Sequence, residues 1–204
     1  RVSDLSISSD NLTFTYEAKS LPYPIDTSYY DNEKHTQADA LSVIPFMDEM
    51  NYEGLSVSGL SDGYYGLTIG GEFIGRFTAR ELERGINMAL LQNTPQYKQA
   101  MKIRQMNEER WLKERKMREF YWVEYNLMRK TGMLWACNEA AVDTLRKYRP
   151  HDIFLQWNGA LWLQYMHKGI REDCVNEQQD LVNQIYEQNK PIPLRIEIKK
   201  FTDL

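Results

Sequence analysis

The stretch that decides the fold runs from Thr94 to Gly132 and reads TPQYKQAMKIRQMNEERWLKERKMREFYWVEYNLMRKTG. Thr94 is a residue type that caps helix N-termini, and Pro95 suits the first helical position, where no backbone N–H is needed. Neither Gly nor Pro recurs before Gly132, which fits a left-handed cap beyond the last turn. The stretch therefore predicts one continuous helix from Thr94 to about Arg129, roughly 50 Å long.

Two apolar patches lie on this predicted helix, with a polar segment between them. The first patch runs from Tyr97 to Met106 and the second from Met117 to Met128. Between them, residues 107–116 are almost all polar, with acidic and basic side chains four positions apart in the order that favours surface pairs. A helix that is buried at both ends and solvated in the middle is typical of one that bridges two bodies. The alternative is one long helix packed across a single domain.

The residues before this helix carry the alternation of β-strands. Residues 2–18 predict a hairpin, and residues 55–77 predict a meander of three strands with a two-residue turn at Gly70-Gly71. Thr78-Ala79-Arg80-Glu81 is a capping box that predicts a second, shorter helix as far as about Leu91.

The residues after it are helical, apart from the last few. Three further helices are predicted, at 138–148 with Asn138 as cap, from Asp152 to about Gly169, and at about 171–189. Residues 194–199 alternate apolar and charged side chains, which predicts one last strand or an extended tail.

The composition divides the chain into a β-rich domain at 1–77 and an α-helical region at 78–204, with the long helix at about 94–130. The predicted fold class is therefore α+β. It consists of an N-terminal antiparallel β meander or small sandwich, followed by a helical region with one very long helix.

Charge and hydropathy exclude several classes of protein. With 42% hydrophobic and 26% charged residues, thirteen Tyr and five Trp, the chain has the composition of a folded globular protein. The net charge of −4 argues against a general nucleic-acid binder. No run approaches the ~20 apolar residues that a membrane span needs. Because the chain begins with Arg1, we expect it to be a fragment or a processed product.

The segment Gly59-Leu60-Ser61-Asp62-Gly63 matches the G-x-S-x-G pattern of serine hydrolases. In those enzymes the serine lies on a strained turn between a strand and a helix. Here the following residues predict a strand, so an ordinary turn is the favoured interpretation. We expect the isolated chain to lack esterase activity.

The other chemically active residue types form no recognisable site. His35, His151 and His167 have no metal-ligand spacing, and Cys137 and Cys174 lie far apart. His151-Asp152, between two predicted helices, favours a helix cap over a catalytic dyad. The sequence therefore predicts no catalytic, cofactor-binding or metal-binding residue, and no cofactor.

Tyrosines gather in or near the predicted β loops. They are Tyr23, Tyr29, Tyr30, Tyr64 and Tyr65. Such rings can stack on sugars, although tyrosines at a sheet edge are more often half-buried packing. A stand-alone module that binds carbohydrate or protein is therefore an alternative function.

Six short elements in order resemble the C-terminal extension of a group of bacterial SGNH (GDSL-type) hydrolases. They are Leu55–Leu60, Gly63–Gly70, Phe77–Leu82, Gly85–Ala89, Asn93–Ala100 and Asn107–Arg110. The resemblance covers about residues 2–135. It implies a non-catalytic accessory region of an esterase or acylhydrolase that supports or docks on an upstream catalytic domain.

The resemblance carries over no catalytic residue, because the chain contains none of the short sequence motifs that hold the catalytic residues of SGNH hydrolases. It implies that the partner is the upstream SGNH domain of the same polypeptide, with an ester or carbohydrate as possible substrate, and that the location is periplasmic or secreted. A docking face is expected on the long helix, notably at Trp111, Met117, Tyr121, Trp122 and Tyr125. The alternative is that the C-terminal helices, with Trp157 and Trp162, cover these side chains. No nucleic acid or membrane span is expected.

Overall fold

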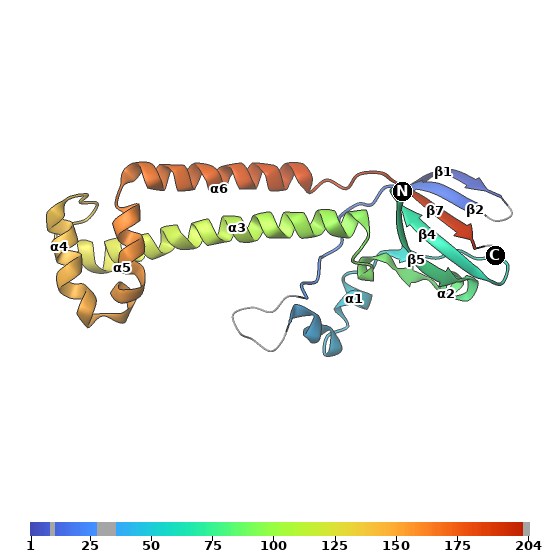
Figure 1. The fold of residues 1–204 in the computed structure, drawn as a ribbon, viewed down its shortest axis with the longest axis horizontal. Coiled ribbons are helices and arrows are strands. Elements are labelled where there is room, and N and C mark those ends of the chain that lie inside the picture. Colours follow the sequence, from blue (N-terminus) through green and yellow to red (C-terminus); the bar gives the residue numbers. More distant parts are fainter. Residues whose placement is uncertain (9–10, 28–35, 202–204) are drawn as a thin grey trace. The chain divides into compact units, whose positions relative to one another are not determined.

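The computed structural model describes residues 1–8, 11–27 and 36–201. The chain forms two compact units (Figure 1): unit 1 comprises residues 1–104 and 187–204, and unit 2 comprises residues 105–186. Helices α3 (Pro95–Val123) and α6 (Lys168–Gln188) contribute residues to both units. The predicted α+β class, an N-terminal antiparallel sheet followed by a helical region with one long helix, is confirmed.

Unit 1 is built on a five-stranded antiparallel sheet with the strand order β1-β2-β7-β4-β5. The strands are β1 (Val2–Ile7), β2 (Asn11–Tyr16), β4 (Tyr64–Ile69), β5 (Glu72–Thr78) and β7 (Leu194–Lys200). The residues predicted as a last strand or a tail thus form the central strand (Figure 1). Ile196 and Ile198 of β7 are almost fully buried because both neighbouring strands flank them.

The hairpin between β4 and β5 turns at Gly70 and Gly71, as the sequence predicts. Their φ angles are +59° and +84°. Consecutive positive φ angles are the requirement of a tight two-residue hairpin turn, and glycine meets it without steric cost.

Two expectations for the residues before α3 are wrong. The short strand β3 (Gly54–Leu55) pairs with β6 (Ile86–Asn87), so it belongs to a separate two-stranded sheet and not to a three-stranded meander. Helix α2 (Ala79–Arg84) begins at the predicted capping box but ends far short of Leu91. The reason is Gly85, whose φ of +93° breaks the helix and turns the chain into β6.

Short helical turns connect the remaining parts of unit 1. They are the 3-10 helices η1 (Gln37–Ser42) and η2 (Met88–Leu90), and α1 (Phe46–Glu49). Ile25, Met47 and Ala89 form a small core of their own beside these turns.

Unit 2 contains the far end of α3, the helices α4 (Glu139–Tyr148) and α5 (Ile153–Tyr165), and most of α6. A 3-10 turn, η4 (Arg149–His151), joins α4 to α5. The predicted caps are present, since the side chain of Asn138 accepts a hydrogen bond from the Ala141 N–H and that of Asp152 accepts from Phe154 and Leu155.

The long helix runs without a loop, as predicted, but its last turn is a π-helix over Glu124–Met128. The Glu124 side chain is 1% exposed and accepts two hydrogen bonds. The backbone N–H of Trp135 donates to its Oε2 at 2.7 Å, and the indole N–H of Trp162 donates to its Oε1 at 2.8 Å. One carboxyl group therefore joins the long helix to the following loop and to α5.

The compact units divide the chain after Arg104 and after Tyr186, whereas composition divides it at residue 77. The helical stretch 105–186 thus lies, in sequence, inside the unit that holds the sheet. No helix in the described part of the chain is long and apolar enough to cross a membrane.

Candidate functional site

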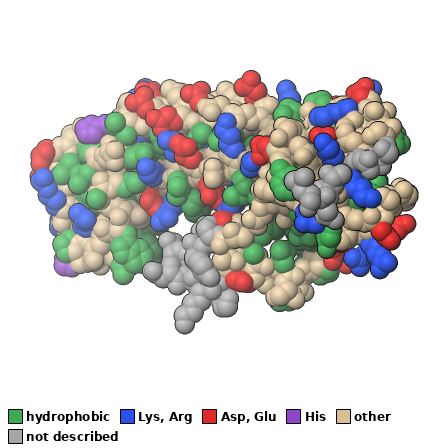
Figure 2. Space-filling view, turned by 45° about the vertical axis from the view of Figure 1, so that its right-hand side comes forward, with side chains coloured by type: hydrophobic (Ala, Val, Ile, Leu, Met, Phe, Trp, Pro, Cys, Tyr) green, Lys and Arg blue, Asp and Glu red, His purple; other side chains and the backbone are tan. Residues whose placement is uncertain are grey.

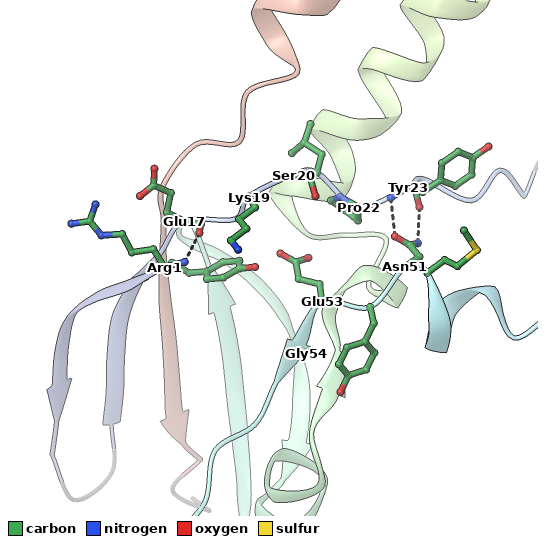
Figure 3. Close-up of a pocket in the computed structure, with 13 residues that line it drawn as sticks. Arg1, Glu17, Lys19, Ser20, Pro22, Tyr23, Asn51, Glu53 and Gly54 are labelled. Carbon is green, nitrogen blue, oxygen red and sulfur yellow. Dashed lines mark hydrogen bonds between the residues drawn. The ribbon is translucent and has the colours of Figure 1, made fainter.

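A cavity of about 490 Å³ opens in unit 1 beside the start of β3 (Figure 3). It is bounded by the end of β2, the loop that follows it, and the segment between α1 and β3. The lining residues are Arg1, Tyr16, Glu17, Lys19, Ser20, Leu21, Pro22, Tyr23, Met50, Asn51, Tyr52, Glu53 and Gly54. Its size lies in the range of small-molecule sites.

Backbone hydrogen bonds hold Glu53 in the wall of this cavity. Its N–H donates to Asn87 Oδ1 at 2.9 Å, and its carbonyl oxygen accepts from the N–H of Met88 at 2.8 Å. Asn87 is the last residue of β6 and pairs with Gly54, and Met88 follows it directly. Figure 3 shows the Glu53 carboxyl directed toward Lys19 and Ser20.

The Glu53 carboxyl has two donors. Gln96 Nε2, from the first turn of α3, lies 3.4 Å from its Oε2. The Tyr16 hydroxyl, from β2, also bonds to the carboxyl. Burial nevertheless raises the pKa of Glu53 above its ordinary value, because desolvation outweighs these two bonds. Burial, followed by the neighbouring Glu53, raises the pKa of Tyr16 to about 12.

Two acceptors at this pair lack a donor among the described residues. They are the Oε1 atoms of Glu53 and Gln96, both out of contact with solvent. Gln96 is only 3% exposed. Since buried polar atoms are nearly always hydrogen-bonded, each of these oxygens marks a place where a donor is expected.

Asn51 fixes the opposite side of the cavity. Its amide accepts from the Tyr23 N–H at 2.9 Å and donates to the Tyr23 carbonyl at 2.9 Å (Figure 3). The loop carrying Tyr23 is therefore tied to the end of α1, and the walls of the cavity are set by hydrogen bonds rather than by packing alone.

Ser61 lies on an exposed turn that leads into β4, so no helix follows it. Lys200 Nζ donates to its Oγ at 2.7 Å, and the Tyr65 hydroxyl lies 3.2 Å from the same atom. These contacts tie the turn to the end of β7. Strand geometry on the C-terminal side is the wrong context for a hydrolase nucleophile, as the sequence predicts.

Among the described residues, one contact joins a histidine to a cysteine. Cys137 Sγ lies 3.4 Å from Nδ1 of His167, and both residues are exposed. Asp152 caps α5, which leaves no His151–Asp152 dyad. His35 lies outside the described residues. Within the described ranges, no group of three or more His, Cys, Asp or Glu side chains is arranged to hold a metal ion.

The described tyrosines of the predicted sugar-binding cluster do not form one surface. Tyr65 is 2% exposed and belongs to the sheet core, while the guanidinium of Arg76 lies 3.8 Å from the centre of the Tyr64 ring. Tyr23 lines the cavity described above. Tyr29 and Tyr30 lie outside the described residues.

Aromatic side chains are exposed on unit 2, and Figure 2 shows hydrophobic side chains at the surface of the molecule. The Phe154 ring is tilted by 38° to that of Trp122 and lies edge-on to that of Trp157, with ring centres 5.3 Å and 5.6 Å away. Of the five residues predicted for a docking face, Trp111, Tyr121 and Tyr125 are 46%, 39% and 48% exposed, Trp122 is half-buried and Met117 is buried.

The Glu53 cavity was not predicted. No sequence pattern distinguishes Glu53 or Gln96 from other polar residues, because their pairing brings together residues 43 positions apart. Asn87 was likewise read as part of a helix, whereas its side chain positions Glu53.

Comparisons with known proteins give two findings. Residues 101–190 match the family model described as "Diltiazem deacetylase C-terminal helical domain". The solved structure titled "BT4096 a gut microbial diltiazem-metabolizing enzyme" is similar at 35% sequence identity with a TM-score of 0.91. The similarity covers 98% of this chain and 46% of that structure's chain. A search of curated proteins found no match.

These findings overturn the resemblance to an SGNH (GDSL-type) extension. The helical region instead matches the C-terminal helical domain of diltiazem deacetylase, and an upstream SGNH domain as partner is not supported. The alternative of a stand-alone carbohydrate- or protein-binding module is not supported either. The short motifs misled because they describe turns, caps and strand ends, which recur in unrelated proteins.

Proposed function

We propose that this chain is part of a diltiazem deacetylase-like hydrolase, which removes an acetyl group from an ester by adding water. The observation that carries the proposal is the structural similarity over 98% of the chain at 35% identity. The match of residues 101–190 to the helical domain of the deacetylase family agrees with it.

Hydrolysis of an acetyl ester needs a nucleophile, a base that takes its proton, and donors for the oxyanion. Among the described residues, Ser61 is the serine with a cationic neighbour, but it lies on an exposed turn and donors for an oxyanion do not surround it. We therefore assign Ser61 a structural role. The chain contributes the sheet and the helical unit to the hydrolase, and not its nucleophile.

The test is an assay of the complete gene product with diltiazem. Mass spectrometry would follow the loss of the acetyl group and the release of the free alcohol, with a buffer blank and a denatured sample as references. We expect deacetylation that Ser61→Ala leaves unchanged. The same protein should release nitrophenol from 4-nitrophenyl acetate.

Two results would count against the proposal. If the complete gene product is folded but deacetylates neither ester, the proposed reaction is wrong. Turnover that disappears in Ser61→Ala but persists in Ser58→Ala, an exposed serine that precedes the same turn, would leave the reaction in place and contradict the structural role of Ser61.

A further inference from the structure

The side chains of Glu53 and Gln96 lack one hydrogen-bond donor between them. One hydrogen bond joins the amide nitrogen of Gln96 to the carboxyl of Glu53, while the Oε1 of each has no donor among the described residues. A carboxylic acid and an amide can form a cyclic pair with two hydrogen bonds. A proton on Glu53 Oε1 supplies the missing donor and lets Gln96 Oε1 accept it.

We propose that the Glu53 cavity is a binding site for a small organic ammonium ion, which enters in exchange for the proton that the Glu53–Gln96 pair holds in the absence of ligand. This site is independent of the ester hydrolysis proposed above.

The walls of the cavity fit an organic cation. Tyr16 and Tyr52 line it together with the apolar side chains of Leu21, Pro22 and Met50. The ring of Tyr23, by contrast, is directed away from Glu53 (Figure 3) and packs edge-on against Phe46, with ring centres 5.6 Å apart. Aromatic faces attract ammonium groups, and a carboxyl at one wall supplies the counter-charge. The volume of about 490 Å³ is enough for an aromatic or aliphatic amine.

The exchange balances in protons and charge. Glu53 begins as a neutral carboxylic acid, and the ligand arrives as an ammonium ion. The O–H bond of Glu53 breaks, its proton passes to the solvent, and a carboxylate–ammonium pair remains. Burial already raises the pKa of the Glu53 carboxyl in the free protein, and an adjacent cation lowers it again.

Other charged and titratable groups face the same space from each neighbouring segment. Lys19 and Arg1 lie at the rim, where both are exposed, and the exposed carboxylate of Glu17 lies beside them. The Tyr16 hydroxyl, with a pKa raised to about 12, stays protonated throughout the range of interest. Lys19 therefore weakens the binding of a cation, because its ammonium group repels a second positive charge near Glu53.

Isothermal titration calorimetry of the full-length protein tests the proposal with 2-phenylethylamine as the probe and the uncharged 2-phenylethanol as its matched control. Measurements in two buffers of different ionisation enthalpy count the protons released. We expect the amine to bind and the alcohol to bind at least about tenfold more weakly. Amine affinity should rise by up to about tenfold per pH unit while Glu53 is protonated, because one proton is released per amine bound.

Three variants make the test specific. Glu53→Gln keeps the shape of the pair and should weaken amine binding at least about tenfold and abolish proton release. Glu17→Gln removes a carboxylate from the rim and should change affinity by less than about threefold, because exposed charges are screened. Lys19→Met should strengthen binding. Circular dichroism of each variant confirms that it is folded.

The proposal is overturned by an amine that does not bind at millimolar concentration, by equal binding of amine and alcohol, or by binding that Glu53→Gln leaves unchanged. Binding without proton release at the lowest pH at which the protein stays folded would also overturn it, since Glu53 would then be ionised before the amine arrives. Loss of ester hydrolysis is not a readout here, so failure of this site and failure of the proposed function are separate results.

Discussion

Replacing Glu124 by Gln should destabilise unit 2 more than any conservative change on the exposed face of the long helix. The side chain is 1% exposed, and each of its oxygens accepts one donor, from Trp135 at 2.7 Å and from Trp162 at 2.8 Å. An amide keeps the shape but presents an NH₂ group to one of those donors. One buried N–H is then left unsatisfied, which costs about 1–3 kcal/mol.

The loss of stability should grow with the number of N–H groups that are left without an acceptor. Glu124→Ala orphans both N–H groups and adds a cavity, so we expect a loss of about 2–6 kcal/mol. Glu109→Gln, at an exposed position on the same helix, is the matched control and should change stability by less than about 0.5 kcal/mol.

Urea unfolding followed by tryptophan fluorescence and circular dichroism measures these differences. A double-mutant cycle with Trp162→Phe isolates the bond to the indole N–H. The double variant should lose less than the sum of the single variants, because Trp162→Phe removes a donor that Glu124→Gln leaves unpaired. Additive losses, or a Glu124→Gln variant as stable as Glu109→Gln, would refute the reasoning.

Three further predictions concern unit 1, two of them with matched controls in unit 2. Gly85→Ala should lower the free energy of unfolding by about 1–2 kcal/mol, because a φ of +93° is strained for any residue with a side chain. Gly169→Ala, within α6, should instead raise it by about 0.5–1 kcal/mol. Thermal unfolding distinguishes the two signs. Thr78→Ala removes the cap of α2 and should cost about 1 kcal/mol in the same assay. The change should be smaller for Thr144→Ala, a half-buried helical threonine whose hydroxyl only donates back to the Ala140 carbonyl. Because the pKa of Glu53 is raised in the folded protein, folding takes up a proton there. Its contribution is full below the unfolded pKa and is lost as pH rises through the folded pKa, so stability relative to Glu53→Gln should fall with pH across that window; a flat difference would contradict the raised pKa.

The sequence was most informative where one short segment decides the local structure. The cap of α3 at Thr94 and Pro95, the caps of α4 and α5, and the glycine turn between β4 and β5 were all predicted, because each depends on residues within a few positions of one another. The alternation at 194–199 predicted a last strand or an extended tail, and the structure shows the strand β7.

Long-range pairing was not accessible in the same way. The alternation of β3 indicates a strand but not its partner, and the partner turned out to be β6 rather than β4. The helix predicted beyond Gly85 failed because a single positive φ angle outweighs the helix propensity of the residues that follow. The Glu53 cavity depends on contacts among β2, the segment before β3 and α3, so no local pattern reveals it.

The central position of β7 determines when the sheet can form during synthesis. The ribosome releases β1, β2, β4 and β5 first, but the strand that pairs β2 with β4 emerges only after all the helices have been made. Until then β2 and β4 each expose an unpaired edge, which is the kind of edge that recruits other chains. Nascent chains are therefore most prone to misassociate while residues 105–186 are being translated. Shortening or extending that helical insertion should alter the length of this vulnerable interval without changing the sheet that eventually closes around β7.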